Sequence, residues 1–216
     1  DPKAYSFKSL VINELMPAPR PDQDLPNVEY VELYNRSEKE FRLLGLSLSN
    51  SRNSAVLPEF WIQPGEYVLL APLAQANQLL EYGNIVPVSL WPTLLNSGDR
   101  LSLTSPQGEV IDRMTYSTSS WGGSEFASGG FSLEVVNPDF LCENSELLRS
   151  SMDKSRGTPG RINSVFSGEI NFNEFKIESA FFVSPNEVEV IFNQLFFPNV
   201  TIDQISFSDG IMADSI

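Results

Sequence analysis

Two glutamates in the stretch EYVELYNR, Glu29 and Glu32, have the clearest potential for chemistry. Paired carboxylates can act as general acid and base, or can hold a divalent cation. The stretch alternates apolar and polar side chains, which is typical of a β-strand. Successive side chains of a strand point to opposite faces, so Glu29 and Glu32 are expected on opposite faces of one sheet. They therefore do not form a glycosidase pair, which needs two facing carboxyls.

Glu32 has a second potential partner in Glu14. Glu14 belongs to the apolar stretch SLVINEL, where it is expected to share a face with Leu10 and Ile12. If the two strands are neighbours, both carboxylates could hold Ca²⁺ or Mg²⁺ together with backbone carbonyls. The other interpretation is that each accepts hydrogen bonds from a loop or is solvated at a strand end. This second interpretation is favoured, because no EF-hand calcium loop accompanies the glutamates.

Composition excludes several other kinds of site. The chain contains no histidine, and Cys142 is its single cysteine. These counts exclude Ser–His and Cys–His nucleophile pairs, a structural zinc site and an intramolecular disulfide. The formal net charge of −14 argues against binding of nucleic acid through a basic patch. We therefore expect no cofactor, no transition metal and no nucleic-acid partner.

The elements that must position these residues are short strands. Apolar runs with a period of two recur along the chain, separated by turn residues such as Pro64-Gly65 and Ser97-Gly98-Asp99. One helix is expected at residues 73–83, closed by Gly83. Many short strands with little helix favour a β-sandwich or a barrel. The expected strands cover residues 9–15, 29–35, 41–49, 55–62, 66–71, 100–105, 109–116 and 131–136.

The strand pattern is interrupted at GTPGRINSVFSG, residues 157–168, as it is in a linker. Beyond it the chain becomes more acidic, with Lys176 as the one basic residue after position 165. Strand-like runs then resume at 171–183 and 186–197. The sequence thus predicts a first domain over residues 8–163, a linker over 164–169 and a second unit over 170–216. The apolar runs, such as residues 68–74, are too short to cross a bilayer, so no membrane insertion is expected.

A series of motifs in the first domain resembles the lamin tail domain, over roughly residues 8–163. The resemblance implies an immunoglobulin-like β-sandwich without a known catalytic set. The last motifs resemble the bacterial surface type, which implies an extracellular, cell-surface or periplasmic protein. The motifs are VINELMP (11–17), EYVELYN (29–35), the segment Leu43 to Asn50, QPGEYVLL (63–70), LNSGD (95–99), residues 108–116, GFSLE (130–134), Asn137-Pro138 and GTPG (157–160).

The second unit, at residues 179–196, resembles the opening of a bacterial immunoglobulin-like domain. Residues 170–216 offer three or four strands, whereas such a domain needs about seven. We therefore expect a partial β unit and a chain that is a fragment of a longer protein. The phenylalanines of the tail and an open strand edge predict either docking on the first domain or self-association with another molecule.

The tryptophans are the remaining candidates for a site. Trp61, Trp91 and Trp121 are expected to plug the ends of the sandwich or cover its core edges. The alternative is an aromatic platform for a glycan, and Trp121 is its best candidate because it lies in the Gly- and Ser-rich run 119–130. That run lacks the phosphate-loop pattern and is expected to be a flexible surface loop.

Together these observations predict an all-β protein, an immunoglobulin-like β-sandwich followed by a partial second β unit. The favoured function is a noncatalytic binding or scaffolding module of an exported or cell-surface protein that contacts a protein or glycan through loops at a sandwich end. The alternatives are an accessory domain of an extracellular nuclease or hydrolase, and a carboxylate- or metal-dependent hydrolase that uses Glu14, Glu32, Asp99 or Asp112. The expected core comprises Val11, Ile12, Val31, Leu33, Leu44, Leu69, Leu101, Leu103 and Leu133.

Overall fold

The computed structural model of the chain describes residues 5–139, 147–168, 177–184 and 187–192. The chain divides into two compact units, residues 1–168 and residues 169–216, and each unit is described by itself. Cys142, Lys176 and the end of the expected tail beyond residue 192 lie outside the described residues. None of the described helices is long and apolar enough to span a membrane.

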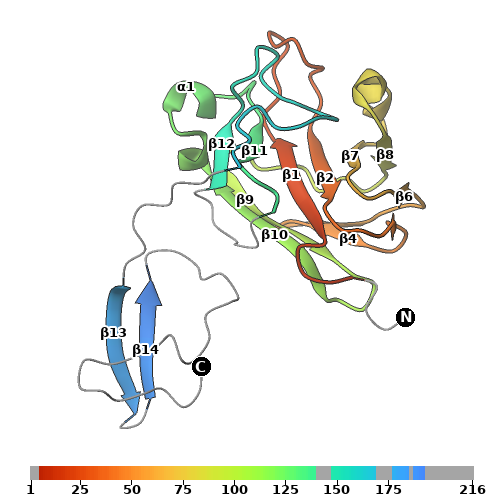
Figure 1. Cartoon of the computed structure of the whole chain (residues 1–216). Coiled ribbons are helices and arrows are strands. Elements are labelled where there is room, and N and C mark those ends of the chain that lie inside the picture. Colours follow the sequence, from red (N-terminus) through yellow and green to blue (C-terminus); the bar gives the residue numbers. More distant parts are fainter. Residues whose placement is uncertain (1–4, 140–146, 169–176, 185–186, 193–216) are drawn as a thin grey trace. The chain divides into compact units, whose positions relative to one another are not determined.

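The larger sheet of the first unit has six strands in the order β12-β11-β1-β2-β7-β8 (Figure 1). Its neighbouring strands are antiparallel except for β7 and β8, which run parallel. The strands β8 and β12 were not predicted from the sequence. The six strands are β1 (Leu10–Met16), β2 (Tyr30–Asn35), β7 (Tyr67–Pro72), β8 (Ile85–Val88), β11 (Leu133–Val135) and β12 (Leu148–Ser150).

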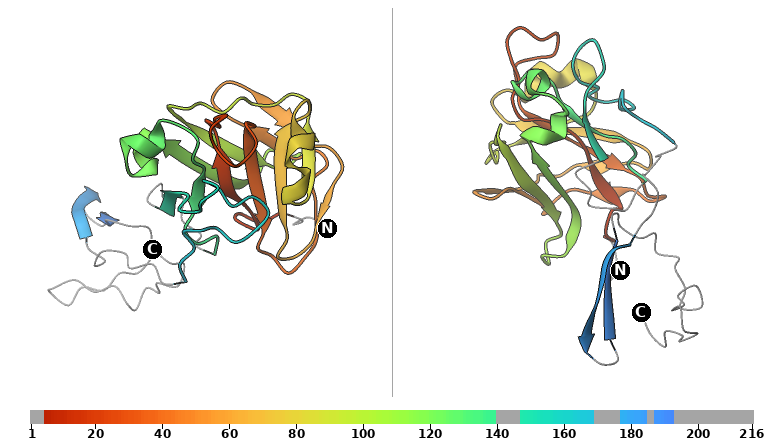
Figure 2. Two further views of the ribbon diagram at one scale, coloured as in Figure 1. Left: turned by 90° about the horizontal axis from the view of Figure 1, so that it is seen from above. Right: turned by 90° about the vertical axis from the view of Figure 1, so that its left-hand side faces the viewer.

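The smaller sheet has the strand order β10-β9-β4-β5, and β3 (Phe41–Arg42) pairs separately with β6 (Trp61–Ile62). Its strands are β4 (Ser47–Ser49), β5 (Ser54–Val56), β9 (Gly98–Thr104) and β10 (Val110–Ser117). In the right-hand view of Figure 2 the green hairpin of β9 and β10 forms a layer apart from the red and orange strands β1 and β2. The first unit is thus a β-sandwich, as predicted.

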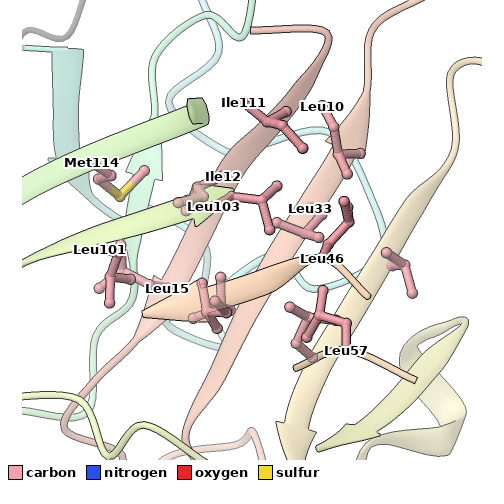
Figure 3. Close-up of a cluster of buried hydrophobic side chains, with 14 of the residues drawn as sticks. Leu10, Ile12, Leu15, Leu33, Leu46, Leu57, Leu101, Leu103, Ile111 and Met114 are labelled. Atoms are coloured by element: carbon pink, nitrogen blue, oxygen red, sulfur yellow. The ribbon is translucent and has the colours of Figure 1, made fainter. Parts of the chain in front are cut away.

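The main core lies between the two sheets. Figure 3 shows Leu10, Ile12 and Leu33 of the larger sheet together with Leu101 and Leu103 of β9. All five are fully buried. Removal of this apolar surface from water is the main favourable contribution to folding. Of the expected core residues, six lie in this cluster: Ile12, Val31, Leu33, Leu101, Leu103 and Leu133.

A second apolar cluster covers the outer face of the larger sheet, the face that points away from the smaller sheet. Leu69 of β7 belongs to this cluster, together with Tyr30 of β2 and Leu79. Leu79 lies in the 3₁₀ helix η1 (Ala76–Tyr82), which occupies the region where a helix was predicted. A sheet covered on both faces explains why every residue of β1 is buried.

Two details of the predicted strands were wrong. The expected strand 41–49 breaks into β3 and β4, because Gly45 adopts a left-handed φ of 83° in a turn. Leu44 lies in this turn and is 43% exposed, so it is not a core residue. The expected strand 55–62 likewise breaks into β5 and β6 around Pro58. Pro58 lacks the backbone N–H that a continuing strand ladder would use.

The Gly- and Ser-rich run 119–130 is also more regular than the expected flexible loop. It contains most of the 3₁₀ helix η2 (Thr118–Trp121) and the short helix α1 (Ser124–Ala127). Gly122 ends η2 in the left-handed region, at a φ of 76°. Glycine suits this turn because it carries no Cβ.

The second unit contains an antiparallel hairpin of β13 (Ile177–Ser184) and β14 (Glu187–Phe192). β14 lies within the expected run 186–197, and β13 overlaps the expected run 171–183 and ends one residue beyond it. Docking or self-association of the tail stays a prediction.

Candidate functional site

Three glutamates lie side by side on the outer face of the larger sheet. In the strand register Glu14 of β1 lies opposite Glu32 of β2 and opposite Glu134 of β11. All three side chains are fully buried. Glu14 therefore meets Glu32 from a neighbouring strand, an arrangement that the sequence allowed. Glu134 was missed, although the alternation in GFSLE is a signal that could have placed it on a sheet face.

The face on which Glu14 lies differs from the predicted one. The register of β1 against β2 shifts between Ile12 and Glu14, so that Asn13 is an extra residue in β1. Such a bulge breaks the strict alternation of faces. Ile12 and Leu15 therefore both point into the main core, and Glu14 points outward.

The three carboxylates are covered by residues 157–165, here called the covering segment. The backbone N–H of Thr158 donates to Glu14 Oε1 at 2.9 Å, and that of Gly160 donates to Glu32 Oε2 at 2.5 Å. The N–H of Val165 and the hydroxyl of Ser164 both donate to Glu134 Oε2. The covering segment, over which the strand pattern of the sequence is interrupted, is thus attached to the sheet through buried carboxylates.

Gly157 lets the covering segment approach the sheet closely. A Cβ at this position would lie 2.6 Å from Leu25 Cδ1, 2.7 Å from the Tyr30 hydroxyl and 3.0 Å from Glu14 Oε1. Side-chain carbons do not approach neighbours this closely without displacing them. The Tyr30 hydroxyl in turn donates to Glu14 Oε1 at 2.6 Å.

The hydroxyl of Thr158 lies between Glu14 and Glu134. The Thr158 hydroxyl lies 3.1 Å from Glu14 Oε2 and 2.9 Å from Glu134 Oε1. A hydroxyl donates only one hydrogen, so both bonds are complete when the protonated carboxyl group of Glu14 donates to the Thr158 oxygen and the Thr158 hydroxyl donates to Glu134. Burial, with the nearby charge of Glu134, raises the pKa of Glu14 to about 7. Burial and the charge of Glu14 likewise raise the pKa of Glu32.

This cluster is built to hold the covering segment. Each of its six carboxylate oxygens has a hydrogen-bond partner, including Asn13, which donates to Glu32 Oε1. In the described part of the chain, no group of three or more acidic or cysteine residues is arranged so that it could hold a metal ion. The hydrogen bonds from Thr158 and Gly160 confirm the interpretation that Glu14 and Glu32 accept hydrogen bonds from a loop.

The other carboxylates of the hydrolase hypothesis lie elsewhere. Asp112 is fully buried, where it forms an ion pair with Lys8 at 2.6 Å and accepts a hydrogen bond from the Ile12 N–H. Its burial raises its pKa. Asp99 accepts hydrogen bonds from the backbone N–H and the hydroxyl of Ser51. These partners hold the fold together and bring neither carboxylate to Glu14 or Glu32.

A surface pocket of about 500 Å³ opens at one end of the sandwich. We call it the end pocket. Three connections form it: the loop from β1 to β2, the end of β7 with the residues that follow, and the loop from β8 to β9. It is lined by Pro17, Ala18, Pro19, Asn27, Glu29, Pro72, Gln75, Trp91, Thr93 and Asn96.

Glu29 and Trp91 are hydrogen-bonded to each other within this pocket. The indole N–H of Trp91 donates to Glu29 Oε2 at 2.6 Å, and the backbone N–H of Leu94 donates to the same oxygen at 3.0 Å. Partial burial raises the pKa of Glu29. Among the described residues, none donates a hydrogen bond to the other carboxylate oxygen, Oε1. The pair therefore presents a fixed aromatic ring beside one free carboxylate oxygen.

Trp121, the binding residue expected from the sequence, lies in the main core. It is 3% exposed, its indole N–H donates to the Phe131 carbonyl at 3.0 Å, and its ring packs edge-on against Tyr116. A ligand cannot stack on a ring that is covered in this way, so a platform role for Trp121 does not fit its position. Trp61 is 48% exposed and lies near Arg42, outside the end pocket.

The family model described as Lamin Tail Domain matches residues 3–118, which is more than half of the 216-residue chain. The chain belongs to the lamin tail domain family. Its all-β, immunoglobulin-like sandwich is the fold class that the sequence predicted. No curated protein matches the chain.

The matched region ends just after β10, whereas the sandwich of this lamin tail domain continues. Strands β11 and β12 extend its larger sheet, and the covering segment closes the carboxylate cluster. The end pocket lies wholly within the matched residues. Glu29 had been considered from the sequence only as a potential partner of Glu32. Its bond to Trp91 joins residues 62 positions apart and left no local signal.

Proposed function

We propose that this lamin tail domain is a noncatalytic binding module of an exported or cell-surface protein, and that it contacts a protein or glycan partner through the end pocket. The observation that carries the proposal is the Glu29–Trp91 pair. It places an aromatic ring and a free carboxylate oxygen in an open pocket at the end of the sandwich. Loops held by a rigid scaffold are a common place for binding residues.

The composition of the pocket supports recognition of a ligand. Pro17, Pro19 and Pro72 restrict the backbone of its walls, so little conformational entropy is lost when a partner binds. The amides of Asn27 and Gln75 offer both hydrogen-bond donors and acceptors. An aromatic ring with a few converging polar groups is the usual composition of a ligand site.

A hydrolase function is less well supported by the same geometry. The carboxylates that lie together, Glu14, Glu32 and Glu134, are fully buried and bonded to the covering segment. A substrate or an attacking water would have to displace that segment to reach them. In the end pocket, Glu29 is the one carboxylate among the lining residues. General acid–base hydrolysis of a glycoside needs two.

An extracellular, cell-surface or periplasmic location is part of the proposal. It is supported by the motifs at Asn137-Pro138 and residues 157–160, which resemble the bacterial surface type. The hairpin of β13 and β14 is consistent with the beginning of a bacterial immunoglobulin-like domain. The net charge of −14 disfavours nucleic acid as the partner.

The test is a binding screen with matched variants. The purified full chain would be applied to a glycan array and a peptide array, together with Trp91→Ala and Trp61→Ala. Trp61 provides the control because it is exposed but outside the pocket. We expect specific binding to at least one class of array member, lost in Trp91→Ala and kept in Trp61→Ala. Binding that survives Trp91→Ala unchanged, or no binding at all, would refute the proposal.

A further inference from the structure

The charge of the end pocket distinguishes between its candidate ligands. Glu29 is the one charged residue among the residues that line it, and none of them is lysine or arginine. Arg20 belongs to the same loop as Pro17 and Pro19, but its side chain packs beside Gly129 and Gly130. The pocket therefore presents negative charge without a neutralising cation of its own.

We propose that the end pocket binds a positively charged side chain, a lysine or an arginine, in an extended segment of a partner protein. This inference rests on the proposed binding function and names the class of ligand. The cationic group would donate a hydrogen bond to Glu29 Oε1 and would lie beside the ring of Trp91. The amide oxygens of Asn27 and Asn96 are further acceptors for its remaining hydrogens.

The prolines and Trp91 suit the rest of such a side chain. Lysine and arginine carry apolar stems that pack along hydrophobic surface while the charged head meets a polar group. Pro17, Pro19 and Pro72 offer that surface around the pocket. The half-buried position of Glu29 excludes part of its solvent, and a bound cation would compensate for this loss.

The charge of the whole chain acts in the same direction. A net charge of −14 attracts cationic segments over distances comparable to the Debye length and raises their rate of association. A neutral oligosaccharide gains nothing from this field. It would leave the Glu29 carboxylate without a counter-charge, and this difference favours a basic protein segment over a glycan.

The experiment measures binding of four fluorescent probes to the full chain by anisotropy at physiological salt. The probes are a lysine–glycine repeat peptide, an arginine–glycine repeat peptide, a glutamine–glycine repeat peptide and a neutral N-acetylglucosamine oligomer. The diagnostic variant is Glu29→Gln, because its amide oxygen can still accept the hydrogen bonds from Trp91 and Leu94. Glu109→Gln gives the same loss of charge on an exposed turn between β9 and β10, away from the pocket.

We expect a basic peptide to bind, and its affinity to fall about tenfold or more in Glu29→Gln and in Trp91→Ala but less than about twofold in Glu109→Gln. Equal losses in Glu29→Gln and Glu109→Gln would show a general charge effect and overturn the inference. Tighter, Trp91-dependent binding of the glutamine peptide or the oligosaccharide would overturn it while the proposed function stands. If no probe binds in a Trp91-dependent way, the inference fails. The array screen then decides whether the proposed function fails too.

Discussion

Replacement of Glu14 by glutamine is predicted to stabilise the protein at neutral and alkaline pH. The folded protein holds the proton of Glu14 more tightly than the unfolded chain does, because burial and Glu134 raise its pKa from 4.5 to about 7. Between these two values the folded state binds more protons than the unfolded state. The free energy of unfolding therefore falls as the pH rises through this range, and stays lower above it.

The size of the effect follows from the same pKa values. Each pKa unit corresponds to about 1.4 kcal/mol, so deprotonation of Glu14 costs the fold about 3 kcal/mol. Glutamine avoids this cost. Its amide can donate to Thr158 Oγ1 as the protonated acid does, and its oxygen can accept from Tyr30 and from the Thr158 N–H. The substitution also removes a negative charge beside Glu32, and that charge contributes to raising the pKa of Glu32.

The assay is urea unfolding of the wild type, Glu14→Gln and Glu109→Gln at half-unit steps from pH 4.5 to 8.5. The wild type and the exposed-site control Glu109→Gln should lose stability in parallel as the pH rises. Glu14→Gln should match them near pH 4.5 and exceed them by about 3 kcal/mol at pH 8. The reasoning is refuted if the wild-type free energy of unfolding is flat over this range, or if Glu14→Gln declines as steeply as the wild type.

Three further tests of the structure use urea unfolding, and two of them compare a pair of variants. Leu103→Ala should lower the free energy of unfolding by about 2–5 kcal/mol, because it leaves a cavity in the main core. Leu44→Ala, at an exposed turn, should lower it by less than about 0.5 kcal/mol. Gly160→Ala should cost at least about 2 kcal/mol more than Gly65→Ala. Both glycines have positive φ, but only at Gly160 would a Cβ collide with a backbone carbonyl. Tyr30→Phe should cost about 1–3 kcal/mol, because it removes the hydrogen bond to Glu14. In the wild type this bond lowers the pKa of Glu14, so its removal should move the pH transition upward. Equal costs within either pair, or an unmoved transition in Tyr30→Phe, would contradict the corresponding assignment.

Much of the larger sheet could be predicted from period-two patterns. The runs around Glu14, Glu32 and Leu69 became β1, β2 and β7 with boundaries shifted by a residue or so. Their strand character implied that Glu14 could meet Glu32. The bulge at Asn13 could not be predicted, because counting alternate residues assumes an uninterrupted strand.

The contacts of the covering segment could not be predicted, for a different reason. Glycine, proline and asparagine are equally typical of a linker and of an irregular segment bonded to a sheet. Thr158 meets Glu14 across 144 positions of the sequence, and no local pattern records such a contact. The same limit applies to the tryptophans. The flanking residues of Trp91 and Trp121 do not indicate that the first lines a pocket and the second lies in the core.

The most direct test of the proposed function follows the indole N–H signals of Trp61, Trp91 and Trp121 by ¹⁵N NMR. The signals would be assigned with single Trp→Phe variants, and the protein titrated with the tightest-binding member of the arrays. Because the Trp91 N–H is bonded to Glu29 inside the end pocket, its signal should shift in proportion to occupancy while the other two stay in place. A Trp91 signal that is unmoved at saturation, or a shift confined to Trp121 or Trp61, would contradict the account.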